Sequence, residues 1–266
     1  VPANQATVIS GAEVQGEYWL VAEAPTKPAN GTFDLTVELK DVASDTKNAS
    51  VLYEVKVLDE LLVLDRSGSM LSPLSFPKID AATGAASLFV DAAGSDGQIG
   101  VVSFGGDNVE SNDDATLEQA LATVTDGQRT AARAAIAGIS IPDGSVLTSI
   151  GDGLEKARLE YAANGTVLGQ DVLVLLSDGM ENEALFASDV LPDLLSDGIE
   201  VHSIALGSGA NQALLQQLAT ATGGTFYYVD VGSLGSSLST GIPANAHFAN
   251  RLSDAFVAAF EASNDL

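Results

Sequence analysis

One short segment of the sequence places oxygen-bearing side chains at a spacing that suits a metal ion. Residues 61–70 read LLVLDRSGSM, so Asp65, Ser67 and Ser69 follow an apolar run at alternate positions. A carboxylate and two hydroxyls are hard oxygen donors, which Mg²⁺ and Mn²⁺ prefer and Ca²⁺ tolerates. Gly68 lets the segment turn tightly, so that both serines can point back toward Asp65. On its own, this segment is an incomplete site.

Two later segments supply the missing ligands. Residues 144–153 read GSVLTSIGDG and offer Thr148 at the entry to an expected helix, while residues 175–179 read LLSDG and end an apolar run with Asp178. Open α/β sheets bind their ligands at the carboxyl ends of the strands, where these segments would meet. We therefore expect all five side chains to converge on one divalent cation, Mg²⁺ first, with Mn²⁺ or Ca²⁺ as alternatives.

The elements that must position these residues alternate from residue 58 onward. Apolar runs typical of buried strands lie at residues 61–64, 99–104, 172–176, 201–206 and 225–229. Helical periods lie between them at residues 79–93, 128–139, 149–163, 188–196 and 210–222. This rhythm predicts an α/β domain with a doubly wound, Rossmann-like, mostly parallel sheet covered on both faces. An antiparallel edge strand is expected near residues 108–111.

The two ends of the chain have different patterns. The pattern of residues 1–57 predicts strands at 17–24, 32–39 and 50–57, with a turn at 41–48. We expect these strands to form an N-terminal antiparallel β extension or partial sandwich. Leu252, Phe256 and Phe260 recur at four-residue intervals, which predicts an amphipathic helix over residues 249–262. We expect two domains, residues 1–57 and 58–266.

The D-x-S-x-S loop at Asp65, the Thr-x-x-Gly-x-Gly entry at Thr148 and the Ser-Asp-Gly turn at Asp178 occur in a particular order and spacing. They resemble the metal-ion-dependent adhesion site (MIDAS) of von Willebrand factor A (vWA) domains, and the resemblance covers residues 58–263. Residues 64–70 resemble the branch found in bacterial surface proteins and in regulators of calcium-activated chloride channels. The resemblance implies that the five residues hold the metal directly or through water and leave one position for a ligand's acidic group. It also implies a last helix that slides when such a ligand binds.

Two functions follow from this resemblance. The first is a metal-dependent adhesion or ligand-binding module of a larger surface or secreted protein, whose partner presents an Asp or Glu carboxylate. Two carboxylates and three hydroxyls leave a divalent ion attractive to such a group. The second is a structural or regulatory vWA domain that mediates assembly with other domains of its parent protein. A chaperone-associated cytoplasmic domain is a third alternative, and we expect the isolated domain to be a monomer.

Composition limits the partners further. A net charge of −25, with only 11 Lys and Arg residues, argues against nucleic acid and anionic lipid as partners. No run is long enough for membrane insertion, and without cysteine there is no disulfide or thiolate site. The sequence begins VPANQ, without an initiator Met or a charged signal sequence, so we expect a segment of a longer polypeptide. An extracellular or cell-surface location rests on the resemblance and the strand-rich leader.

Catalytic alternatives fit the sequence less well. Phosphatases of the haloacid dehalogenase type need a second aspartate two residues after the first, where this chain has Ser67, which cannot transfer that proton at neutral pH. His202 lies in an expected buried strand and His247 in a connector, and no Gly-x-Ser-x-Gly elbow is present. The loop at residues 207–212 lacks the third glycine of a dinucleotide-binding turn. We therefore expect no enzyme. Glu181 and Asn182 are expected to be solvated loop residues, with a position on the ligand face as the alternative. Asp152 is expected to cap a helix or face solvent.

Overall fold

The computed structural model describes most of the chain in separate stretches. These are residues 7–14, 17–23, 31–39, 43–53, 57–72, 77–107, 114–141, 147–167 and 169–229, with Leu252, Ala255, Phe256, Ala258 and Ala259. The chain divides into two compact units, Val1–Val55 and Lys56–Leu266. Each unit is described by itself.

The first unit contains two antiparallel strand pairs. Strand β1 (Thr7–Val14) pairs with β2 (Glu17–Glu23), and β3 (Gly31–Leu39) pairs with β4 (Ala43–Tyr53). The antiparallel β extension is therefore present, but the expected arrangement of three strands was wrong. Strand β1 was missed because Gly11 and a register shift between Val8 and Ser10 interrupt its alternation.

The expected turn at residues 41–48 was also wrong. Strand β4 begins at Ala43 and carries polar residues opposite β3, with Lys47 facing Leu35 and Asp45 facing Val37. Pairing with an apolar partner strand here outweighs the weak strand propensity of Asp, Asn and Lys.

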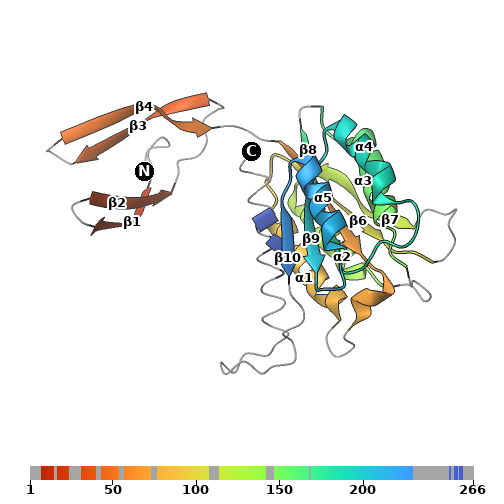
Figure 1. The fold of residues 1–266 in the computed structure, drawn as a ribbon. Coiled ribbons are helices and arrows are strands. Elements are labelled where there is room, and N and C mark those ends of the chain that lie inside the picture. The colour runs from red at the N-terminus through yellow and green to blue at the C-terminus, as the bar shows by residue number, and fades with distance from the viewer. Residues whose placement is uncertain are drawn as a thin grey trace, which may run out of the picture. The chain divides into compact units, whose positions relative to one another are not determined.

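The second unit is built on a six-stranded sheet, ordered β10-β9-β8-β5-β6-β7 (Figure 1). Its strands are β5 (Leu58–Asp65), β6 (Gln98–Phe104), β7 (Ala115–Thr123), β8 (Gln170–Ser177), β9 (Glu200–Leu206) and β10 (Phe226–Val229). All neighbouring pairs are parallel except β6 with β7. Strand β5 is central, between β6 on one side and β8 on the other, so the strand order reverses there.

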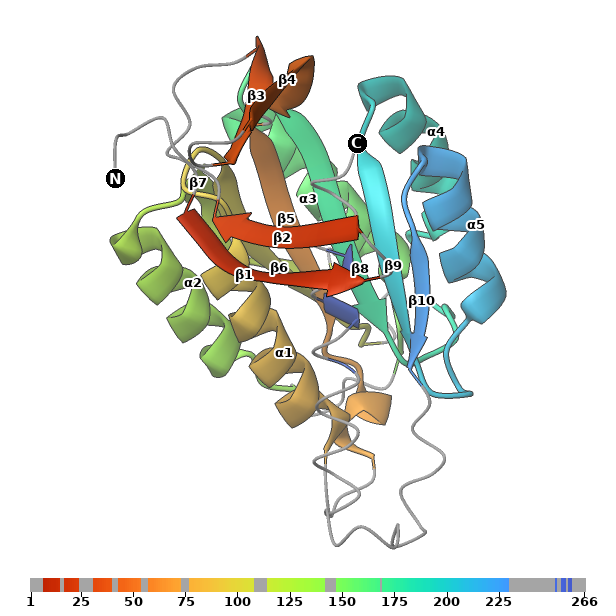
Figure 2. The ribbon, with the colours of Figure 1, turned by 90° about the vertical axis from the view of Figure 1, so that its left-hand side faces the viewer.

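Helices cover both faces of this sheet (Figure 2). They are α1 (Lys78–Ala92), α2 (Asp126–Gly138), α3 (Ile150–Asn164), α4 (Ala187–Asp197) and α5 (Gln212–Thr222), with a short 3-10 helix, η1 (Gly68–Leu71), after β5. Leu62 and Leu64 of β5 join the core with α1 and α2, whereas Leu61 and Val63 join the core with α3, α4 and α5. Alternate side chains of one strand thus enter two cores, which confirms the doubly wound α/β fold.

The antiparallel edge strand occurs at a different place from the one expected. The predicted residues 108–111 lie outside the described residues, and the observed edge strand is β7, Ala115–Thr123. Its sequence, ATLEQALAT, consists largely of residues that favour helices, so pairing with β6 decides its conformation.

Residues near the C-terminus pack on the sheet as helical turns. Leu252, Ala255, Phe256 and Ala259 are buried, and the Phe256 ring meets Phe89 of α1 edge to face, with ring centroids 6.3 Å apart. Helical geometry at these positions agrees with the predicted helix, and Phe260 lies outside the described residues. Over the part of the chain that the structure describes, no helix is both long and apolar enough to cross a membrane.

Candidate metal centre

Asp65 is the last residue of β5, and two hydrogen bonds hold its buried carboxylate in place. Its Oδ1 accepts from the backbone N–H of Ser67 at 2.7 Å, and its Oδ2 accepts from Ser177 Oγ at 2.7 Å. Burial and the nearby negative charge of Asp178 together raise the pKa of Asp65 to about 6, although the hydrogen bonds from Ser177 and Ser67 oppose the rise. A carboxylate in this setting is stabilised by a neighbouring cation.

The two serines of the first loop connect Asp65 to Asp178. Ser67 Oγ and Ser69 Oγ are 3.0 Å apart, and Ser69 Oγ donates to Asp178 Oδ1 at 2.6 Å. Asp178 lies just after β8 and is buried, as is Ser67, while Ser69 is exposed. The carboxyl ends of β5 and β8 thus bring two carboxylates and two hydroxyls into one hydrogen-bonded group.

Thr148 joins this group from the segment before α3. The Thr148 side chain is buried, and a Cβ placed on Gly179 would lie 2.7 Å from Thr148 Oγ1 and 3.6 Å from Ser69 Oγ. Only glycine therefore allows the turn after Asp178 to approach the threonine so closely. Ser149, not Thr148, is the N-cap residue of α3, which leaves the Thr148 hydroxyl available to the group.

Asn182 is exposed and Glu181 is partly buried, and both residues also hold the segments around Thr148, which the sequence did not predict. Thr148 N donates to Asn182 Oδ1 at 2.8 Å, and Asn182 N donates to Thr148 O at 3.1 Å. Glu181 Oε1 accepts from the backbone N–H groups of Gly151 (3.0 Å) and Ala187 (2.8 Å). The sequence does not reveal these contacts because their partners lie on another loop.

Lys78 is a second residue that the sequence does not single out. It is the first residue of α1, and its Nζ donates to Asp178 Oδ2 at 2.5 Å. A lysine is unfavourable at a helix N-terminus, where the helix dipole prefers negative charge. That mismatch was the available signal, and the carboxylate of Asp178 accounts for it.

The residues at this site fit a divalent cation. The donor set consists only of carboxylate and hydroxyl oxygens, and its two carboxylates, Asp65 and Asp178, are buried close together. The ammonium group of Lys78 stands beside Asp178 as a positively charged partner, which shows that this position attracts a cation. Mg²⁺, Mn²⁺ and Ca²⁺ all accept such oxygen ligands.

The other polar residues considered from the sequence take structural positions. His202 lies buried in β9, its Nδ1 accepts from Thr225 N at 3.1 Å, and burial lowers its pKa to about 4. His247 lies outside the described residues. Asp152 Oδ2 accepts from Ser149 Oγ and from Leu185 N. Gly207, with φ 81°, ends β9, and Asn211 caps α5, so this loop is a strand-to-helix turn.

Comparisons with known proteins agree with this fold. The family model of the von Willebrand factor type A domain matches residues 59–238, more than half of the chain. No curated protein matches the chain.

Solved structures with the same fold include three from different settings. Proximal thread matrix protein 1 from the mussel byssus, solved with a zinc-occupied MIDAS motif, has a TM-score of 0.57 at 22% identity, over 77% of this chain and 46% of the mussel protein. A von Willebrand factor type A protein from Catenulispora acidiphila has a TM-score of 0.55 at 16% identity, over 86% of this chain and 47% of that one. The pilus adhesin SpaC from Lactobacillus rhamnosus GG has a TM-score of 0.52 at 14% identity, over 86% and 34%.

This chain thus spans less than half the length of each of these three proteins. The match to the family model, together with the doubly wound sheet, confirms what the three sequence motifs implied: the chain belongs to the von Willebrand factor type A family.

Proposed function

We propose that this domain binds one divalent cation through Asp65, Ser67, Ser69, Thr148 and Asp178, and through that cation binds an acidic group of a partner protein. The observation that carries the proposal is the hydrogen-bonded group of oxygens from the loops at the carboxyl ends of β5 and β8, with the Thr148 hydroxyl close to Gly179 in the turn after Asp178. Its donor types match those that Mg²⁺ prefers, and Mn²⁺ and Ca²⁺ are alternatives.

The protein residues have distinct roles in this site. Ser177 and the backbone of Ser67 orient Asp65, since each holds one oxygen of its carboxylate. Asn182 fixes the backbone of Thr148 on both sides, which holds the threonine hydroxyl toward Gly179. A bound cation supplies Lewis acidity toward an incoming carboxylate. Two carboxylates cancel the double charge of the ion without giving the site an excess of negative charge, so a third carboxylate can still bind at the open coordination position.

The partner and location follow from the same chemistry. A ligand carboxylate from Asp or Glu completes the coordination, and the exposed Ser69 marks the side from which it approaches. The similarity to a byssus matrix protein and a pilus adhesin supports a surface or secreted parent protein. The alternative is a vWA domain that uses the same cation to assemble with other domains of its own parent protein.

Calorimetric titration with Mg²⁺, Mn²⁺ and Ca²⁺ tests the cation site. It should be done in monovalent salt on the order of 1 M, because this salt screens the general attraction of an acidic surface for cations. We expect Asp65→Ala to weaken Mg²⁺ binding by at least about tenfold, since it removes a buried ligand. Ser69→Ala, at an exposed position, should weaken it as well and serves as a second test if Asp65→Ala fails to fold.

Asp193→Asn is the matched control, because Asp193 is exposed on α4 and the substitution also removes one negative charge. Equal Mg²⁺ affinity in the wild type, Asp65→Ala and Ser69→Ala would refute the site. Binding to an immobilised Glu-containing peptide, with and without EDTA, then separates the two functions. Loss of peptide binding on chelation supports recognition, and loss of self-association alone supports assembly.

A further inference from the structure

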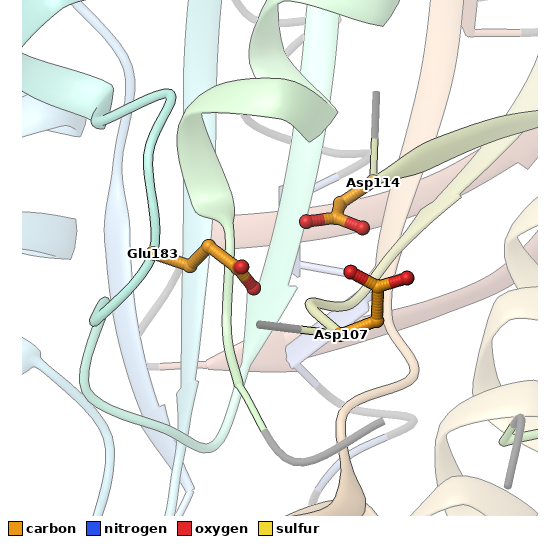
Figure 3. A group of neighbouring side chains, drawn as sticks. All are labelled: Asp107, Asp114 and Glu183. Carbon is orange, nitrogen blue, oxygen red and sulfur yellow. The ribbon is translucent and has the colours of Figure 1, made fainter. Parts of the chain in front are cut away.

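A second group of carboxylates lies outside the five residues of the metal centre. Asp107 follows β6, Asp114 precedes β7, and Glu183 belongs to the segment between β8 and α4. Figure 3 shows the three side chains turned toward a common space. One oxygen from each carboxylate lies within 4.8 Å of the other two.

Two of these carboxylates are buried without the partners that burial requires. Glu183 is 3% exposed and Asp114 is 7% exposed, whereas Asp107 reaches solvent. Both oxygens of Glu183 and Oδ2 of Asp114 lack a hydrogen-bond partner. A buried, unpaired carboxylate costs several kcal/mol, so folded proteins normally pair it or place it on a metal ion.

The surroundings add negative charge and no compensating cation. Burial, together with the negative charges of Glu183, Asp107 and Asp152, raises the pKa of Asp114 to about 7. Among the described residues, no lysine, arginine or histidine forms an ion pair with Asp114 or Glu183. Within this part of the chain, no basic side chain therefore balances the charges of Asp114 and Glu183.

The backbone is arranged to let Glu183 reach this position. A Cβ on Gly106 would lie 1.7 Å from Glu183 Oε2, so any other residue at position 106 would displace the carboxylate. Gly106 is fixed in turn by Leu147, since Gly106 N donates to Leu147 O at 2.8 Å and Leu147 N donates to Gly106 O at 3.3 Å.

We propose that Asp107, Asp114 and Glu183 form a second cation site, selective for Ca²⁺. Two oxygens that each lie about 2.4 Å from one Ca²⁺ are at most about 4.8 Å apart, and the three oxygens of this group lie within that limit. Ca²⁺ accepts several carboxylates in irregular geometry and takes water on its open side, which here is the side of the exposed Asp107. Mg²⁺ demands near-ideal octahedral geometry and suits this group less.

The second site is connected to the metal centre through the segment that carries Thr148. Glu183 follows Asn182, whose side chain and backbone both bond to Thr148, and Asp107 follows Gly106, which pairs with Leu147. Ca²⁺ at the second site would therefore fix both segments that bond to Thr148 or to its neighbour Leu147. The proposal does not depend on the proposed function, because the two sites share no ligand.

The test measures Ca²⁺ binding in an Asp65→Ala background, where the first site is disabled. In salt on the order of 1 M, calorimetry should show one saturable Ca²⁺ site in Asp65→Ala. Adding Glu183→Gln should weaken it by at least about tenfold, and adding Asp193→Asn should leave it unchanged. Saturating Ca²⁺ should also raise the Tm of Asp65→Ala by about 2 °C or more, and that rise should be absent with Glu183→Gln.

Several outcomes would overturn the proposal. These are no saturable Ca²⁺ site in Asp65→Ala, an unchanged site after Glu183→Gln, or an equal loss with Asp193→Asn. If Glu183→Gln fails to fold, Asp107→Asn changes the exposed member of the group and gives the same test. If only the proposed metal centre at Asp65 does not exist, Mg²⁺ binds equally to the wild type and Asp65→Ala, and this result is distinct from a failure of the second site.

Discussion

We expect the cation affinity of the proposed metal centre to depend on Lys78 as well as on the five proposed oxygen ligands. The ammonium group lies 2.5 Å from Asp178 Oδ2, so it neutralises one of the two carboxylates that a divalent ion needs. A bound cation and this ammonium group repel each other across the same carboxylate.

We therefore predict that Lys78→Ala raises the affinity for Mg²⁺, by roughly three- to tenfold, since a nearby positive charge is removed. Titration calorimetry of Lys78→Ala against the wild type checks this prediction. Lys156→Ala, on α3, removes the same charge elsewhere and should leave the Kd unchanged. An unchanged or weaker Kd in Lys78→Ala would show that the lysine supports the site instead of competing with the cation.

At this scale, the sequence identifies the metal centre better than its supports. Asp65, Ser67, Ser69, Thr148 and Asp178 were predicted together because each follows a strand or precedes a helix within a short motif, and the structure brings them together. Lys78, Ser177 and Asn182 were missed. Their contacts join positions that are 34 to 112 residues apart, and no local pattern encodes such pairings.

At the scale of elements, the central strand β5 carries an ionisable residue, Glu60, at a position that is shielded from solvent. Glu60 is 1% exposed, and one of its carboxylate oxygens lacks a hydrogen-bond partner. Burial raises the pKa of Glu60 to about 8, and only the positive charge of Arg129 on α2 opposes the rise. The folded protein therefore holds this proton at neutral pH, whereas the unfolded chain releases it near the ordinary glutamate pKa of 4.5.

Stability must then fall as pH rises from 5 to 8, because folding takes up a proton across that range. Glu60→Gln abolishes this loss, so we predict that the variant gains roughly 4 kcal/mol of unfolding free energy at pH 8 and little at pH 4. Urea unfolding at several pH values in EDTA measures the difference between the variant and the wild type. Asp193→Asn should show no such pH-dependent gain. If the unfolding free energy of Glu60→Gln ran parallel to that of the wild type across this pH range, the raised pKa of Glu60 would be contradicted.

The elements themselves follow from the sequence to different degrees. The sequence predicted strands β5, β6, β8, β9 and β10 within a few residues, because burial on both faces of the sheet leaves few polar interruptions. It also predicted helices α1 to α5 within a few residues, because their apolar residues recur with the helical period. The bounds of strands β1, β4 and β7 were not predicted, because each strand is defined by its antiparallel partner and not by its own composition.

For the whole molecule, the clearest division is the one between Val1–Val55 and Lys56–Leu266. The cores on both faces of the sheet are built from residues of the second unit. The domain boundary near residue 57 remains a prediction about independent folding.

We predict that a chain of residues 56–266 folds cooperatively and binds Mg²⁺ with the Kd of the full chain, since all five proposed ligands lie in it. Thermal unfolding and calorimetry on both chains check this directly. The Tm values should agree within about 4 °C, which corresponds to a free-energy difference near 1 kcal/mol for a domain of this size. Insolubility, or a Kd weaker by an order of magnitude, would mean that the first unit completes the second.

The two outer strands of the sheet have a consequence for how copies of the domain meet. Strand β10 has only four residues, and β7 meets β6 with register shifts between Ile99 and Val101 and between Val101 and Val102. Fibres grow when a foreign strand extends a long, regular ladder of free backbone groups, and over the described residues neither border of this sheet provides one. The net charge of −25 on each chain adds electrostatic repulsion, so we predict that edge-to-edge pairing of this sheet between copies is disfavoured while the sheet stays folded.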